Sequence, residues 1–470
     1  MFAELGDELA DHGLRYVQGE VSTGASFPDG RSAVIGTDPD ALAAELDRLR
    51  ERHAWTQLMA EASPHLDSLL PLLGMNLDSP EATGLLKALH RDTGSAVPFT
   101  TLLAGSGRDL LRDRFCSEEL IMAWLPWLLH VGLGPHDAGG ALWSVLLMAT
   151  LVAGNPAPVG GSGRLAEALT ALVSAHGAEI RTGVDVDTVL TDGGRATGVE
   201  TTDGERFTAA QAVIASTTPD QLYGRLLRDA PGIPESTRAQ ASRYRYRRGC
   251  FQISLALSAR PRFADSRLDG GGGINVGRGL NELVTSVRQA EDGLLPTYPS
   301  ISWHEPTAVD PGRAPAGRAV VRLQVLDAPL HPIGDAADLI AVDQGWTTSV
   351  AERFADRVIG EAAHHISGLE QMVLARHILS PADLALTNRN AGPGDHASGE
   401  NALSQAFTQR PIPAHRGGYA TDVPNLYLIG AATWPGPGVG GSSGRAVARH
   451  LLSRPPTPPR STELMGSRRG

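Results

Sequence analysis

The 470-residue sequence predicts an α/β protein in which segments of two domains alternate along the chain. Residues 425–452, "NLYLIGAATWPGPGVGGSSGRAVARHLL", read as a short apolar strand, a glycine-rich turn and a helix. Residues 158–218 read as a glycine turn, an amphipathic helix and a series of short strands, whereas residues 63–153 have the apolar spacing of helices. A chain of this length, 41% hydrophobic, is long enough for two or three domains.

The N-terminal third is predicted to be mainly helical. We expect helices over residues 4–17 and 40–60, separated by "FPDGRSAVIGT", where a P-D-G turn leads into a short strand. Helices continue over 63–153, with breaks at Gly and Pro. The apolar stretch "GGALWSVLLMATLVAG" at 139–154 is shorter than the ~20 residues that cross a bilayer. It predicts a buried helix, with a membrane-touching helix as the alternative.

The middle of the chain has the clearest pattern. In "PVGGSGRLAEALTALVSAHG" one helix face carries Leu165, Ala168, Leu169 and Leu172, and Gly177 ends the helix. Short strands separated by Gly-Gly and Asp-Gly turns follow from residue 178, and the last of them, "AQAVIAS", is apolar as a buried strand would be. Beyond it we expect mixed strands over 219–330, a helix near 342–365 and an irregular stretch over 380–418.

Charge and cysteine content narrow the possible functions. The net charge of -11 argues against a general nucleic-acid binder, which needs a basic footprint, and the basic run "RYRYRR" at 243–248 is predicted to be a solvated strand end. Cys116 and Cys250 are too few for a disulfide framework or a thiolate zinc site, which fits a reducing, cytoplasmic compartment. The acidic N-terminus does not read as a signal peptide, and the Pro- and Arg-rich residues 454–470 are predicted to be disordered.

The glycine-rich turn matches two motifs. Gly440, Ser442 and Gly444 form G-x-S-x-G, but the acid and histidine of a hydrolase triad must follow the serine in that order, and only His450 follows, in the same predicted helix. Gly436, Gly438 and Gly441 form G-x-G-x-x-G, but too few residues remain for a complete dinucleotide-binding unit. The turn can still form one wall of a phosphate or polyol site. No histidine has metal-ligand spacing, so we predict no metal site.

Several segments together resemble the phytoene desaturase-like branch of the FAD-dependent oxidoreductases, in the flavin amine oxidase superfamily. The middle block 158–216 is similar to that family's middle block. The segments "SPADLALTNRN", "LSQAFTQRPIP" and "NLYLIGAATWPGPGVGGSSGRAVA" are similar to its C-terminal block. Further similar segments extend the resemblance over about residues 1–453. The resemblance implies an FAD-binding, Rossmann-like domain interleaved with an α+β substrate domain.

The resemblance also implies cofactor contacts and domain limits. Gly430 and Ala431 would lie near the FAD phosphates, Gly438, Val439 and Gly440 near the ribityl chain and flavin ring, and the backbone of Val186 near the adenine. The FAD domain would take residues 153–218 and 413–453, and the substrate domain residues 1–152 and 219–412. Residues 425–430 would then pair with the strand at 211–216, and a helix would begin near Gly440.

One family feature is missing from the sequence. The family begins with a strand, a G-x-G-x-x-G turn, a helix and an acidic residue for the ribose, whereas "MFAELGDELADHGLRY" resembles a segment further along the family pattern. The FAD domain is therefore expected to be incomplete, by truncation rather than true loss. We accordingly expect weak or no FAD binding by this chain, and exposed apolar surface and self-association at the FAD sheet.

The resulting prediction is an FAD-dependent oxidoreductase of dehydrogenase or desaturase type, acting on a small apolar, isoprenoid or lipid-like substrate. No catalytic residue is assigned. The alternatives are a cofactor-poor scaffold or binding protein derived from such an enzyme, and peripheral contact of residues 120–153 with a membrane. No nucleic-acid partner is expected.

Overall fold

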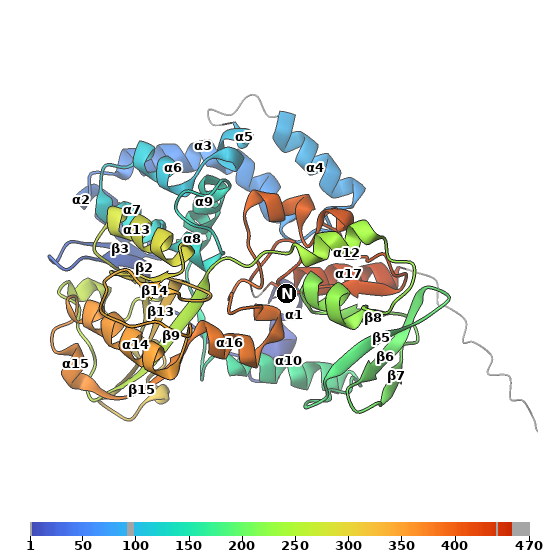
Figure 1. Ribbon diagram of the computed structural model, residues 1–470. Helices are drawn as coiled ribbons and strands as arrows, with labels where there is room; N and C mark the ends of the chain where they lie inside the picture. Colours follow the sequence, from blue (N-terminus) through green and yellow to red (C-terminus); the bar gives the residue numbers. More distant parts are fainter. Residues whose placement is uncertain (1, 92–97, 439, 454–470) are drawn as a thin grey trace, which may run out of the picture.

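The computed structural model describes residues 2–91, 98–438 and 440–453, and it confirms the predicted α/β class. A mainly helical layer lies above a large sheet, and a smaller sheet region lies beside them (Figure 1). The helical layer comprises α2 (Pro39–Arg48), α3 (Arg52–Leu72), α4 (Pro80–Arg91), α5 (Phe99–Ala104), α6 (Gly107–Arg114), α7 (Glu118–Trp124), α8 (Trp127–His130) and α9 (Gly140–Leu151).

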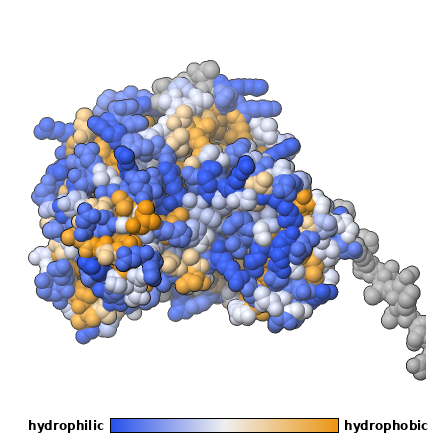
Figure 2. Space-filling view, viewed as in Figure 1, coloured by the Kyte–Doolittle hydropathy of each residue, from blue (hydrophilic) through white to orange (hydrophobic). Residues whose placement is uncertain are grey.

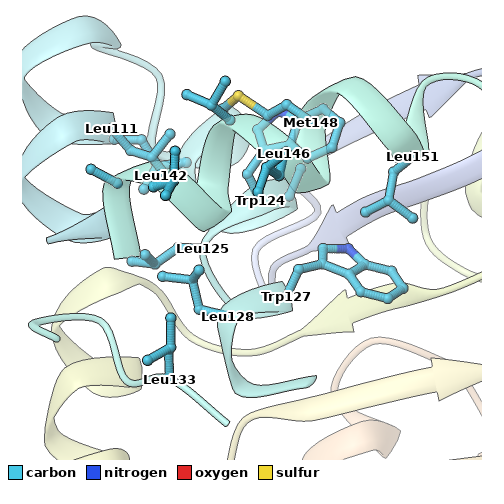
Figure 3. Packing of buried hydrophobic residues seen from close by; sticks show 14 of the residues in the cluster. Leu111, Trp124, Leu125, Trp127, Leu128, Leu133, Leu142, Leu146, Met148 and Leu151 are labelled. Carbon is cyan, nitrogen blue, oxygen red and sulfur yellow. The ribbon is translucent and has the colours of Figure 1, made fainter. Parts of the chain in front are cut away.

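The helical layer has its own core. Side chains from α6, α7, α8 and α9 meet there, among them Leu111, Trp124, Leu128 and Leu142 (Figure 3). The predicted buried helix at 139–154 is confirmed as α9, since eight of its twelve residues are buried. Its apolar side chains therefore lie inside the protein. Among the described residues, no helix combines the length and the apolar character needed to cross a membrane.

The large sheet has seven strands in the order β15-β9-β13-β12-β10-β2-β3. It joins segments far apart in sequence: β2 (Val21–Ser26), β3 (Ser32–Gly36), β9 (Gly249–Leu257), β10 (Ile274–Val276), β12 (Ile301–His304), β13 (Ala319–Ala328) and β15 (Val373–Leu379). Strands β2 and β10 are parallel and the other neighbours antiparallel. One face packs against α14 (Thr348–Ala363) through an apolar core that includes Phe251, Leu323 and Phe354. The opposite face is apolar where Ala33, Ile35 and Leu326 join the core of the helical layer, and polar around Arg322 and Gln324.

The smaller region holds a two-stranded parallel sheet of β8 (Val213–Ala215) and β16 (Leu426–Leu428), with α17 (Ser442–Leu452) after it. A meander of β5 (Val186–Asp192), β6 (Arg195–Thr201) and β7 (Arg206–Thr208) lies below it (Figure 1). The helix α10 (Gly163–Ala175) packs the predicted face on α1 (Phe2–Asp11), with Leu9 and Leu172 buried between them.

The remaining elements connect these parts. They are β1 (Tyr16–Val17) paired with β4 (Ala157–Pro158), β11 (Leu294–Leu295) paired with β14 (Gly334–Asp335), α11 (Pro219–Gln221), α12 (Glu235–Ser242), α13 (Leu280–Glu291), α15 (Leu369–Met372) and α16 (Pro381–Thr387).

Two local predictions are wrong, and a third is correct only in part. The first helix ends at Asp11 and not at residue 17, because Gly13 adopts a left-handed φ of 84° that ends the turn and β1 follows. The series of strands predicted from residue 178 begins only at Val186, and residues 178–184 are exposed and outside any strand. The stretch 380–418 is less irregular than expected, since it contains α16 and several 3₁₀ turns. The predicted disordered tail, 454–470, lies outside the described residues.

The basic run at 243–248 is also not a solvated strand end. It precedes β9, but Arg248 is only 3% exposed and its Nη1 lies 2.6 Å from Glu291 Oε1. Arg247 Nη1 lies 2.5 Å from Asp137 Oδ2, and Arg245 pairs with Glu400. Carboxylates from three distant segments therefore pair with the run, in which Arg248 is buried and Arg247 half-buried, whereas Arg243 and Arg245 are exposed.

Candidate cofactor and substrate sites

The predicted pairing of the two short apolar strands is confirmed. Leu426 lies opposite Val213 and Leu428 opposite Ala215, in parallel. Because the strands are parallel, both carboxyl ends lie at the same sheet edge, where α/β proteins bind their ligands. Gly430 follows one strand at this edge and Ser216 follows the other, with room for a close backbone approach, since a Cβ on Gly430 would lie 3.8 Å from Ser216 Cβ.

The turn after β16 places backbone donors at that edge. Gly430 and Gly438 adopt φ values of 96° and 147°, which favour glycine, and a Cβ on Gly438 would meet nothing within 4 Å. The helix α17 starts after Gly441, which has no side chain to cap it, so the first N–H groups of this helix can bind an anion. Ser443 Oγ accepts a hydrogen bond from the Gly430 N–H at 3.0 Å and ties the turn to the helix. The predicted contact Val439 lies outside the described residues.

A residue that the sequence analysis missed supports this turn. Arg410 is fully buried; its Nη2 donates to the carbonyl of Ala431 at 2.7 Å and its Nη1 to the carbonyl of Glu400 at 2.9 Å. Its Nε has no hydrogen-bond partner, and no carboxylate in the described chain pairs with it. An uncompensated buried cation is costly, so a nearby anion such as the FAD pyrophosphate would stabilise it. No sequence pattern marks Arg410, because it lies in a stretch without periodicity.

Val186 lies in the same region, but its side chain and its carbonyl already have partners within the protein. It is the first residue of β5 and packs against the cluster that contains Val213, Leu426 and Leu428. Its carbonyl already accepts a hydrogen bond from Arg225 Nη1 at 2.7 Å. Its contact with the adenine stays a prediction, as do the contacts of Gly430, Ala431, Gly438 and Gly440 with FAD.

An apolar groove adjoins the same turn. Its volume is about 720 Å³, and its lining includes Leu77, Leu86, Phe99, Leu103, Leu403 and Phe407. The ring of Phe407 stacks on Trp434, with centroids 4.6 Å apart, and Trp434 belongs to the turn that follows β16. Figure 2 shows an apolar area on the surface between α4, α5 and the segment 403–409. The groove therefore offers an apolar binding surface next to the candidate cofactor turn.

Comparison with known proteins shows the family and the fold. Residues 11–332 match the profile of a family described as flavin containing amine oxidoreductase. The chain is 27% identical to pyridine nucleotide-disulfide oxidoreductase domain-containing protein 2 of Mus musculus, over 95% of this chain and 82% of that protein. It is 25% identical to phytoene desaturase of Neurospora crassa, over 93% of this chain and 71% of that protein. An oxidoreductase from Methanosarcina mazei shares the fold, with a TM-score of 0.53, 13% identity and coverage of 96% and 84% of the two chains.

Proposed function

Since the chain belongs to the flavin-containing amine oxidoreductase family, with FAD as its cofactor, we propose that it is a dehydrogenase or desaturase for a substrate with a large apolar part. The observation that carries this proposal is the apolar groove beside the turn after β16, joined to it by the Phe407–Trp434 stack. When bound, FAD accepts the hydride that the substrate loses.

The described residues fit the phosphate end of this cofactor. The uncapped start of α17 supplies N–H donors, Gly438 leaves open space beside the backbone, and Arg410 adds a buried positive charge behind Ala431. These groups would hold and orient the cofactor. The remainder of the binding surface stays a prediction from the family resemblance.

The groove fits the apolar part of a substrate. Aliphatic and aromatic side chains form half of its lining, and the charged groups Asp78, Lys87 and Arg416 are also among its lining residues. Removing apolar ligand surface from water gains roughly 25 cal/mol per Å², so contact with such a lining favours an apolar chain. The lining would also exclude water from the part of the substrate that it covers.

A probe of the groove tests the substrate class. We expect a fluorescent polyene alcohol to bind the purified chain, and Phe407→Ala to weaken this binding about tenfold, which corresponds to about 1.4 kcal/mol. The matched control is Leu386→Ala, because Leu386 is 85% exposed and lies outside the groove. Equal loss in both variants, or no binding by the unchanged protein, would contradict the proposed substrate class.

A second candidate function, a cofactor-poor binding protein, is favoured by the exposed apolar side chains near the smaller sheet. Ile180, Val184 and Ile214 are 48%, 39% and 47% exposed, and residues 178–184 pair with no strand in the described chain. Titration with FAD separates the two functions. A flavin absorption band retained after gel filtration, and bleached anaerobically by substrate, supports the enzyme. Binding of the apolar probe without retention of FAD supports the binding protein.

A further inference from the structure

The polar face of the large sheet is unusual for a surface inside the protein. On β13, Arg322 and Gln324 alternate with the buried Val321, Leu323 and Val325. Arg322 lies opposite Ser254 of β9 and His304 of β12, and Gln324 lies opposite Gln252 and Ser302. A sheet face that packs on a core is normally apolar, so these side chains face something other than a core.

They face a pocket of about 390 Å³, a size suited to a small molecule. Gln252, Ser254, His304 and Arg322 form one wall. The other walls come from residues 17–19, 155–162, 270–272 and 305–309, with Arg313 also in the lining. None of these residues lines the apolar groove, so the two sites are distinct.

Arg322 is the exceptional group in this pocket. Its Nε is buried without a hydrogen-bond partner, and within the described residues no carboxylate pairs with its guanidinium. Other partly buried arginines have carboxylates: Arg357 lies 2.6 Å from Asp335, and Arg278 lies 2.8 Å from Glu361. Burial lowers the pKa of Arg322, but a guanidinium stays charged in proteins. Its positive charge therefore lacks a counterion from the protein.

The neighbouring titratable groups leave this charge uncompensated. Glu305 is in the lining, but its Oε1 accepts a hydrogen bond from Arg260 Nε at 3.0 Å. Burial lowers the pKa of His304 to about 3, so this ring is neutral at physiological pH. Its Nδ1 donates to the carbonyl of Gly272 at 2.8 Å, which leaves Nε2 to accept from Ser302 Oγ. Arg313 is exposed, so water and salt screen its positive charge.

We propose that this pocket binds the carboxylate of a small monoanionic ligand on Arg322. The planar guanidinium matches the two oxygens of a carboxylate, and the hydroxyl of Ser254 and the amide of Gln252 are further donors in the lining. Gln252 Oε1 already accepts from Gln324 Nε2, so its own Nε2 is the group that faces a ligand oxygen. A dianion such as phosphate fits less well, because Arg322 is the one interior cation among the described lining residues and Glu305 adds negative charge.

The test compares charged and neutral ligands of one shape. We expect hexanoate to raise the melting temperature of the full chain at constant ionic strength, and hexanamide to leave it unchanged. Arg322→Met should weaken hexanoate binding at least tenfold in calorimetry, and Arg322→Lys less. The exposed Arg318 provides the control Arg318→Gln, which should bind hexanoate like the unchanged chain.

Three results would overturn the proposal: equal binding of hexanoate and hexanamide, tighter binding of inorganic phosphate than of hexanoate, or unaltered hexanoate binding by Arg322→Met. The comparison of hexanoate with hexanamide and phosphate uses the unchanged chain, so it tests the proposed carboxylate site even if Arg322→Met does not fold. Because the apolar groove is not involved, this result is independent of the polyene probe.

Discussion

Arg410 Nη2 lies 2.7 Å from the carbonyl oxygen of Ala431 and so links the segment before β16 to the turn after it. The Arg410 side chain is fully buried, and both hydrogen bonds of its guanidinium shorter than 3 Å go to backbone carbonyls. The position of the turn therefore depends on a side chain 21 residues earlier. We therefore expect Arg410 to be a positioning residue that acts on a bound cofactor through Ala431.

Arg410→Met should lower both stability and FAD affinity. The carbonyls of Ala431 and Glu400 would lose their donor, at about 1–3 kcal/mol for each buried group left unpaired, and the turn would lose its nearby charge. We expect at least a tenfold rise in the FAD dissociation constant, measured by flavin fluorescence. Arg410→Lys should retain part of the affinity. If FAD binds Arg410→Met as it binds the unchanged protein, Arg410 is only structural.

Neighbouring strands of the smaller sheet offer a matched pair of substitutions. Leu428 is fully buried, whereas Ile214 on the adjacent strand is 47% exposed. Leu428→Ala should therefore cost about 2–5 kcal/mol of unfolding free energy, and Ile214→Ala less than half as much. Urea denaturation of the two variants measures the difference. Equal costs would show that Ile214 is covered in solution, as self-association at this sheet would produce.

His415 should make the protein sensitive to acid. Burial lowers the pKa of its imidazole to about 4, against about 6.5 in the unfolded chain. The unfolded chain therefore binds more protons between these values, and the stability contributed by neutral His415 is lost as pH falls from about 6.5 to about 4. The variant His415→Gln can still hydrogen-bond Tyr223 but does not titrate. Between pH 6.5 and pH 4 its free energy of unfolding should therefore fall by up to about 1.4 kcal/mol less per pH unit than that of the unchanged protein. Denaturation curves at pH 7 and pH 5 measure this difference. If the unfolding free energies of both proteins change equally between the two pH values, the prediction for His415 is wrong.

Asp327 should have the opposite pH dependence. Burial raises the pKa of its carboxyl group to about 6, so the folded protein binds the extra proton between about 3.8 and 6 and loses stability as pH rises through that range. Asp327→Asn keeps an acceptor for Ser286 and Ser300 and removes the charge. We expect it to be more stable than the unchanged protein by on the order of 2–3 kcal/mol at pH 8 and about equally stable at pH 4. A variant that is less stable at pH 8 would show that the carboxylate charge is needed.

Periodic segments were predictable from the sequence. The face of α10 with Leu165, Ala168, Leu169 and Leu172 packs on α1, because helical spacing leaves few other ways to bury it. The pairing of β16 with β8 followed from the family resemblance, because two short apolar runs contain no information about their partners.

Other features depend on contacts between distant segments. The acidic partners of the run at 243–248 are Asp137, Glu291 and Glu400, so the burial of Arg248 cannot be predicted from the run itself. Residues 178–184 resemble a strand but have no partner in the described chain, and a strand needs a partner to form. Arg322 and Arg410 look like ordinary arginines in sequence, since only the fold shows which cations lack a carboxylate.

The order of the strands in the large sheet has a consequence for biosynthesis. Its edge hairpin of β2 and β3 is made early, yet its partner β10 follows some 250 residues later, and β15 later still. The parallel sheet of β8 and β16 likewise closes only when residues about 213 positions after β8 are available, since Leu426 pairs with Val213. At the usual ~5–20 residues per second, the emerging chain carries unpaired strand edges for about 10–50 seconds. Folding rate should therefore be limited by long-range strand pairing, and the nascent chain should depend on chaperones more than its final stability implies.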